Sequence, residues 1–222
     1  MWIQKILFGG RWIIKNMKKL LLSGEMDVNC YFIENQGKCY IIDPGYEKEK
    51  VIKYVKDNNW KVMGILLTHG HRDHIGAIDA FKVPVYIHEK EYGVLEENYK
   101  NVFKEKTYDL KDINIVKINE SKIFPIGDKN IQVIYTPGHT IGGVCYKFGH
   151  DLYTGDTLFK GRVGKWIFPT GDLNLLKKSI INLIENQNEN IRIHPGHYES
   201  STIGEEKRNN SFYNEWKSIR KS

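Results

Sequence analysis

The stretch that decides the fold is Thr68-His69-Gly70-His71-Arg72-Asp73-His74, which directly follows an apolar run over residues 61–67. The run predicts a buried strand, so the stretch lies in the loop where that strand ends. Imidazole and carboxylate groups are ligands of zinc, iron and manganese. In an extended loop His69 and His71 can point the same way, whereas Asp73 and His74 diverge and can serve a second ion. The stretch therefore predicts a metal site.

Three more candidate ligands occupy similar settings later in the chain. His139 follows a Pro-Gly turn in the segment 136–140, Asp156 ends Thr154-Gly155-Asp156, and His197 ends Pro195-Gly196-His197. Each of them comes just after a predicted strand, and rigid strands position the loops that carry chemistry. The repeated order of strand, tight turn and ligand indicates that these side chains belong to the same site.

Seven ligands can serve two divalent ions if one carboxylate bridges them. We expect one ion at His69, His71 and His139, and the other at Asp73, His74 and His197, with Asp156 as the bridge. Each ion would keep a position open for substrate, which is typical of a catalytic site. Zinc, iron and manganese all suit these ligands, and zinc is our first expectation. Asp73 and Asp156 would also orient a hydroxide shared by the two ions, which is the catalytic role we predict for them.

The remaining sequence predicts a mostly β core flanked by helices. Strands are expected over residues 18–22, 28–34, 38–43, 61–67, 84–87, 113–118, 130–136, 143–148, 151–155 and 191–193. Helices are expected over 46–59, from near His74, over 172–186 with Asp172 as the N-cap, and from 204 onward. The charged segment 92–112 has no clear periodicity and receives no assignment. Residues 1–16 are expected to be a peripheral extension, with a turn at Gly9-Gly10, and residues 17–222 the domain proper.

Composition narrows the range of functions. The net charge is +6, but the lysines are scattered and no block of like charges occurs, so we expect no nucleic-acid partner. No apolar run is long enough for a transmembrane helix and no cleavage signal follows the N-terminus, so we expect a cytoplasmic protein without a membrane contact. Cys30, Cys39 and Cys145 lie in strand-like runs and are expected to be reduced core thiols.

The motifs resemble those of the metallo-β-lactamase superfamily, and most closely its glyoxalase II-like, or hydroxyacylglutathione hydrolase-like, branch. The segments are HGHRDH at 69–74, TPGHT at 136–140, TGDTLF at 154–159 and PGH at 195–197, and the similarity runs from about residue 18 to 210. The resemblance implies an α+β fold, a four-layer αββα sandwich, and the division of ligands given above. It also implies that Asp43, in Asp43-Pro44-Gly45, supports a metal-binding histidine.

One loop departs from the pattern of that branch. Where relatives carry an arginine and an aspartate, this chain has Lys165 and Ile167. Lysine and arginine differ where a planar fork of donors is used, so the departure concerns the substrate rather than the metals. We expect Arg162 and Lys165, with Lys160 nearby, to form a cationic rim for an anionic substrate, although solvated surface lysines are the simpler alternative.

The resemblance implies hydrolysis of a small thioester such as S-lactoylglutathione. Few residues follow His197, so we expect no counterpart of the helical domain with which full-length glyoxalase II enzymes grip glutathione. We therefore expect a high KM and tolerance for different thiols. A persulfide dioxygenase with a single iron and a nucleic-acid phosphodiesterase remain alternatives. A β-lactamase is less favoured because those enzymes lack a bridging aspartate, and a non-catalytic scaffold is less favoured because no ligand is missing.

Overall fold

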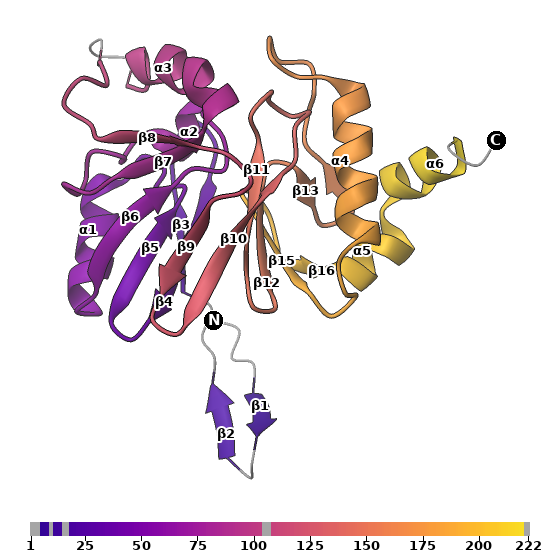
Figure 1. The fold of residues 1–222 in the computed structure, drawn as a ribbon, viewed down its shortest axis with the longest axis horizontal. Helices are drawn as coiled ribbons and strands as arrows, with labels where there is room; N and C mark the ends of the chain where they lie inside the picture. Colours follow the sequence, from indigo (N-terminus) through magenta and orange to yellow (C-terminus); the bar gives the residue numbers. More distant parts are fainter. Residues whose placement is uncertain (1–4, 9–10, 15–17, 104–107, 220–222) are drawn as a thin grey trace.

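Two six-stranded sheets face each other in the computed structural model, which describes residues 5–8, 11–14, 18–103 and 108–219 (Figure 1). The first sheet has the order β3 (Lys19–Leu22), β4 (Val28–Asn35), β5 (Lys38–Ile42), β6 (Lys61–Leu66), β7 (Val85–His88) and β8 (Ile115–Ile118). The second has the order β16 (Ser201–Thr202), β15 (Arg192–Pro195), β12 (Asp151–Gly155), β11 (Val144–Phe148), β10 (Lys129–Tyr135) and β9 (Ile123–Ile126).

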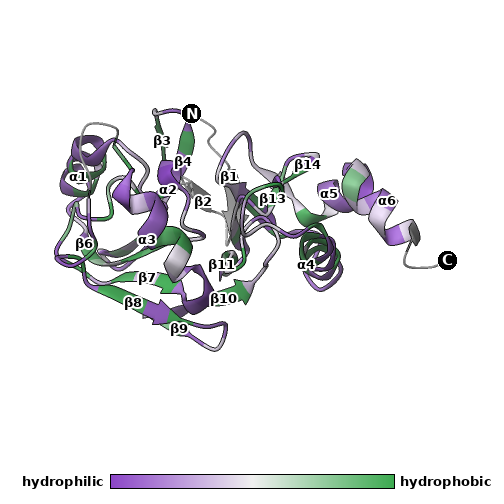
Figure 2. Ribbon diagram, turned by 90° about the horizontal axis from the view of Figure 1, so that it is seen from above, coloured by the Kyte–Doolittle hydropathy of each residue, from purple (hydrophilic) through white to green (hydrophobic). Residues whose placement is uncertain are grey.

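Helices cover the outer face of each sheet. The first sheet carries α1 (Lys48–Asp57), α2 (Arg72–Ile75), the 3-10 turn η1 (Glu89–Glu91) and α3 (Tyr92–Lys100). The second carries α4 (Leu173–Glu185), α5 (Ile203–Asn209) and α6 (Ser211–Ile219). Figure 2 shows hydrophobic and hydrophilic residues interspersed along α1 and α4, as expected of helices with one buried face. The result is the four-layer αββα sandwich that the resemblance implied.

Side-chain alternation along the strands builds three layers of core. In β4, Cys30 and Phe32 pack under α1, whereas Tyr31 and Ile33 point into the space between the sheets. A third apolar cluster joins α4 to the outer face of the second sheet, where it includes Leu152. Successive side chains of a strand point to opposite faces, so each sheet can bury both faces at once.

Strands β6, β10, β12 and β15 end at one edge of the sandwich. Strands β5, β6, β7 and β8 are parallel, and so are β12 and β15, with α4 crossing between the last two. Backbone hydrogen bonds hold this edge together. Val144 N donates to Thr68 O at 2.9 Å and joins the two sheets, and Gly196 N donates to Gly155 O at 2.8 Å. Carboxyl ends of parallel strands are where open sheets usually carry their ligand sites.

The observed elements match most of the predicted ones. Helix α4 begins as expected, with the Asp172 side chain accepting a hydrogen bond from Leu175 N at 2.9 Å. The helix expected near His74 begins at Arg72, because His71 has the extended backbone of an N-cap. The unassigned segment contains α3, and β9, β13 (Leu158–Phe159), β14 (Arg162–Val163) and β16 were not predicted. The three cysteines are buried and free, which confirms the expectation of reduced thiols.

At the N-terminal end, β1 (Lys5–Phe8) and β2 (Arg11–Ile14) pair antiparallel with each other. The turn expected at Gly9-Gly10 lies outside the described residues, and so does the boundary expected between residues 16 and 17. The division into an extension and a domain therefore stays a prediction. Among the described helices, none is long and apolar enough to cross a membrane.

Candidate metal centre

The seven predicted ligands come together at this edge of the sandwich. His69 and His71 lie between β6 and α2, Asp73 and His74 lie in α2, and His139, Asp156 and His197 follow β10, β12 and β15. A cavity of about 620 Å³ opens onto five of them, namely His71, Asp73, His139, Asp156 and His197. The other two, His69 and His74, do not line the cavity and have exposed fractions of 2% and 0%.

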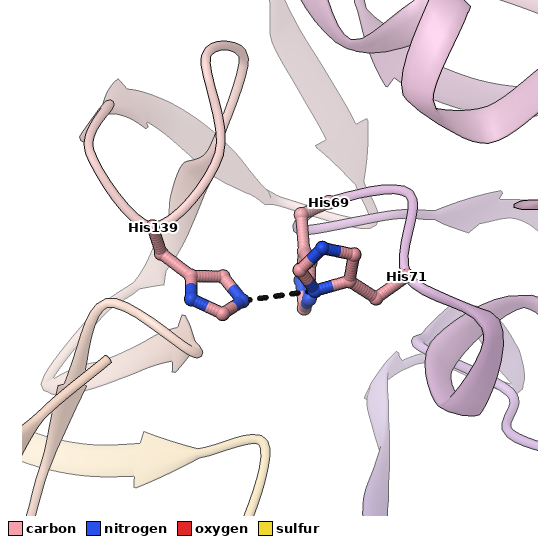
Figure 3. Close-up of side chains that lie close together, drawn as sticks. All are labelled: His69, His71 and His139. Atoms are coloured by element: carbon pink, nitrogen blue, oxygen red, sulfur yellow. Dashed lines mark hydrogen bonds between the residues drawn. The ribbon is translucent and has the colours of Figure 1, made fainter. Parts of the chain in front are cut away.

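The first group consists of three imidazoles. One ring nitrogen from each of His69, His71 and His139 lies within 4.8 Å of the others. His71 Nδ1 and His139 Nε2 are 3.0 Å apart, and the rings converge from the loops of both sheets (Figure 3). Three imidazole nitrogens gathered this closely are a ligand set that suits a borderline divalent ion.

The second group contains Asp73, His74 and His197, whose ligand atoms also lie within 4.8 Å of one another. Asp73 Oδ2 is 3.1 Å from His197 Nε2 and 3.5 Å from His74 Nε2. The structure therefore brings together the same two sets of three that the sequence predicted.

Asp156 lies between the two groups. Its Oδ1 is 3.5 Å from His74 Nε2, and its Oδ2 is 3.4 Å from His197 Nε2 and 3.7 Å from His139 Nε2. One carboxylate thus reaches imidazoles of both groups, which is the position expected of a bridging ligand.

Hydrogen bonds at the far side of three rings fix which nitrogen faces the centre. His139 Nδ1 donates to the carbonyl oxygen of Lys165 at 2.6 Å, and His197 Nδ1 donates to that of Asp27 at 2.6 Å. A carbonyl can only accept, so Nδ1 carries a proton in both rings, and Nε2 is the nitrogen that faces inward. His74 Nδ1 likewise donates to a carboxylate oxygen of Asp43 at 2.9 Å. Such partners orient metal-binding histidines and raise their basicity.

The inward atoms fit a cation. In the described part of the chain, His69 Nε2, His74 Nε2, His197 Nε2 and Asp156 Oδ1 are buried without a hydrogen bond of acceptable geometry. Buried polar atoms are normally paired, because an unpaired one costs about 1–3 kcal/mol. Four such atoms at this centre, all of them good metal donors, are accounted for by divalent ions bound at the two groups.

The two groups differ in their electrostatics. Burial lowers the pKa of His69 and His139 and lowers that of His71 to about 4, so these rings are neutral at neutral pH. Burial also acts on His74, but the carboxylates of Asp73, Asp156 and Asp43 outweigh it and raise its pKa to about 9. Burial is outweighed in the same way at His197, where Asp156 and Asp73 raise the pKa to about 11. The second group therefore carries carboxylates that attract positive charge.

Comparison with known proteins identifies the family. A family model described as the metallo-beta-lactamase superfamily matches residues 23–197. The chain belongs to the metallo-β-lactamase superfamily. The match confirms the resemblance drawn from the motifs, and the four-layer fold agrees with it.

Three members of the superfamily illustrate the range of similarity. Hydroxyacylglutathione hydrolase GloC of Haemophilus influenzae is 32% identical over 200 residues, which cover 84% of this chain and 92% of the relative. The structure of the B3 metallo-β-lactamase BLEG-1 aligns with a TM-score of 0.79 at 34% identity, covering 89% of this chain and 99% of that chain. TTHA1623 in a di-iron-bound form aligns with a TM-score of 0.77 at 31% identity, covering 87% and 98%.

A further combination of buried groups, Asp43 with His69 and His74, also meets the distance requirement for a metal ion. Asp43 is already engaged, however: Oδ1 accepts from Thr68 N at 2.8 Å, and Oδ2 accepts from Thr68 Oγ1 at 2.6 Å and from His74 Nδ1. It therefore orients His74 rather than competing for an ion, as the superfamily resemblance implied.

The predicted substrate residues Arg162 and Lys165 both line the cavity. Lys160 does not line it and instead pairs with Glu199 at 3.1 Å. Sequence reasoning missed the apolar part of the wall, which includes Met26, Phe159, Phe168 and Tyr198. Two of these could have been found from their positions, because Tyr198 follows a ligand and Phe168 lies in the loop that departs from the superfamily branch. Met26 lies in the short loop before β4 and carries no local signal.

Proposed function

We propose that this chain is a metal-dependent hydrolase that holds two divalent ions and hydrolyses a small thioester such as S-lactoylglutathione. The observation that carries the proposal is the position of Asp156, whose two carboxylate oxygens lie 3.4–3.7 Å from imidazole nitrogens of both groups. A structural site would need only one group of ligands with all positions filled. Zinc is the first candidate for both ions, and the di-iron form of TTHA1623 supports iron as an alternative.

In this proposal His69, His71 and His139 would hold one ion and Asp73, His74 and His197 would hold the other, with Asp156 placed between the two groups as a ligand available to both. Bound there, the ions would supply Lewis acidity toward a carbonyl oxygen and lower the pKa of water so that it is a nucleophile at neutral pH. The chain contributes orientation. Asp73 and Asp156 line the cavity with ionised carboxylates, because His74 and His197 outweigh burial and hold the pKa of both below the usual value. These carboxylates can accept hydrogen bonds from an attacking water and so direct its lone pair at the substrate.

The thioester assignment rests on the similarity to GloC, whose name states hydroxyacylglutathione hydrolysis. A thiolate also leaves without protonation, so the reaction needs no separate general acid. At the cavity wall, Arg162 and Lys165 offer cations to a carboxylate of the substrate, while Phe168 and Tyr198, with 38% and 61% of their surface exposed, offer apolar contacts.

A second candidate is hydrolysis of a β-lactam. It is favoured by the similarity to BLEG-1, which is described as a B3 metallo-β-lactamase and aligns over 99% of its length. The same carboxylates and the same cavity would orient water toward a strained amide. Persulfide oxidation at a single iron would require only His69, His139 and Asp156, which are all present.

The test combines metal analysis with a substrate panel. Protein saturated in turn with zinc, iron and manganese is offered S-lactoylglutathione, simple acyl thioesters, a β-lactam, a phosphodiester and glutathione persulfide. We expect two ions per chain and release of free thiol from the thioesters. Ring opening of the lactam without thiol release would favour the second candidate. Oxygen consumption with the persulfide, and no hydrolysis of any substrate, would show that the hydrolase assignment is wrong.

A further inference from the structure

Glu91 is a fully buried glutamate, with 0% of its surface exposed, and it does not line the cavity. It is the last residue of η1, just before α3. Its Oε1 accepts a hydrogen bond from Gly70 N at 3.0 Å, and its Oε2 accepts one from Gly142 N at 2.7 Å. Both oxygens of one carboxylate are therefore bonded to backbone N–H groups of two distant loops.

Those two loops carry the three imidazoles of the first group. Gly70 stands between His69 and His71 in the loop after β6 of the first sheet, and Gly142 lies shortly after His139 in the loop between β10 and β11 of the second. Figure 3 shows that His139 approaches His69 and His71 from the opposite side. The Glu91 carboxylate thus joins the two sheets close to the place where their ligands meet.

We propose that Glu91 is a positioning residue that sets the spacing between the loop of His69 and His71 and the loop of His139, and so tunes the affinity of the first metal group. The inference rests on the proposed function, because it requires an ion at that group. Glu91 acts through the backbone of the loops and does not itself contact substrate or metal.

Close packing leaves these loops little room to adopt another spacing. A Cβ atom at Gly70 would lie 2.6 Å from Leu95 N, and one at Gly142 would collide with the backbone N of Glu91. Contacts under 3.0 Å are not tolerated, so both positions require glycine for the close approach of the segment that carries Glu91. The segment 91–95 therefore lies directly against both loops.

The chemistry of the two donors explains why the residue is a glutamate. Each N–H group is directed at its own oxygen, and a carboxylate of this length offers one acceptor atom to each of them. A glutamine would accept one hydrogen bond and turn its NH₂ group toward the other N–H. Burial of such a group is costly: it raises the pKa of Glu91 to about 7, although the N–H groups of Gly70 and Gly142 oppose the shift. An apolar residue at position 91 would avoid this burial cost, but it could not accept the two hydrogen bonds that join the loops.

Glu206 provides a matched control. It is also a buried glutamate, 1% exposed, and its Oε2 accepts from Gly161 N at 2.8 Å and from Asn210 Nδ2 at 2.9 Å. Those partners belong to neither of the loops that carry the first group. Glu91→Gln and Glu206→Gln therefore remove a similar buried carboxylate, but only the first variant should change the spacing of the imidazoles.

The experiment loads the full chain with Co²⁺ and measures the two dissociation constants by competition with a chelator, together with the visible spectrum and the melting temperature. A His139→Ala variant gives the reference spectrum of protein loaded only at the second group. In Glu91→Gln we expect one ion to bind about 10–100-fold more weakly, with the residual spectrum approaching that reference, and the other ion to keep its parental affinity. Glu206→Gln should lower the melting temperature but keep both affinities.

A Glu91→Asp variant, which keeps the charge but is one methylene shorter, disturbs folding less and should weaken the same ion. Parental affinities for both ions in Glu91→Gln or Glu91→Asp would overturn the inference while leaving the proposed function intact. Equal weakening in Glu206→Gln would also overturn it, since general destabilisation would then explain the effect. A parent chain that binds no divalent ion would overturn the proposed function and the inference with it.

Discussion

The Oδ2 atom of Asp43 accepts a hydrogen bond of 2.9 Å from Nδ1 of His74, and the two side chains are both fully buried. Asp43 is itself held by the backbone N and the hydroxyl of Thr68, the residue just before His69. This arrangement turns His74 Nε2 toward Asp73 and Asp156. One carboxylate therefore orients a ligand of the second group and anchors the loop that carries the first.

Asp43→Asn should weaken the ion at the second group about 10–100-fold, because the amide cannot accept from Thr68 and His74 together as the carboxylate does. It should also lower the free energy of unfolding by about 1–3 kcal/mol, since a buried donor loses its partner. Chelator competition and denaturant unfolding measure the two effects. Asp79→Asn, which removes only an exposed pair with Lys48, is the control. Unchanged metal affinity in Asp43→Asn would show that His74 does not depend on Asp43.

Asp156→Ala should reduce turnover by orders of magnitude, because the carboxylate lies between both groups and its loss disturbs both ions at once. The variant should also bind less metal and melt at a lower temperature in the presence of metal, since binding energy is partly folding energy. Steady-state kinetics on metal-saturated protein tests this. Turnover close to that of the parent would rule out the mechanism with two ions.

Arg162→Ala should raise KM more than it lowers kcat for an anionic thioester, and the effect should fade as salt is added, because the guanidinium lies at the cavity wall and acts through charge. The same holds for Lys165→Ala. Lys160→Ala is the control, because Lys160 is paired with Glu199 and does not line the cavity. Kinetics that are independent of salt and equal in all three variants would mean that these are ordinary surface cations.

The pH dependence of the free energy of unfolding should show the titration of the Glu91 carboxyl. Its folded-state pKa, about 7, is above the ordinary value of 4.5, so the fold favours the protonated carboxyl. The stabilisation is present below about pH 4.5 and is lost as the pH rises through 7. Between pH 5 and pH 8, metal-free parent protein should therefore lose stability relative to Glu91→Gln, by on the order of 3 kcal/mol. Denaturant unfolding of both proteins at the two pH values tests this, and parallel curves would contradict it.

The ligand set was predictable because each ligand follows a strand whose apolar run is plain in the sequence. Strand β9 was not, because Pro125 lies inside it. Proline cannot donate to a sheet ladder, and β9 is tolerated only because it lies at the edge of its sheet. Strands of two residues, such as β13 and β14, are too short to show any periodicity.

Glu91 escaped prediction for a different reason. It lies next to a charged segment that has the composition of a solvated surface, and its burial arises only where two sheets, distant in sequence, approach each other. Periodicity reports the faces of single elements, whereas the Gly70 and Gly142 contacts depend on how the sheets are placed. The wall residue Met26 was missed for the same reason, since only the folded chain brings it to the cavity.

Anomalous scattering from a crystal of metal-saturated protein, recorded at the absorption edge of the bound metal, tests the proposed site with two ions most directly. We expect two peaks per chain, one within ligand distance of His69, His71 and His139 and the other within ligand distance of Asp73, His74 and His197, with the Asp156 carboxylate within reach of both. A single, fully occupied peak would contradict it.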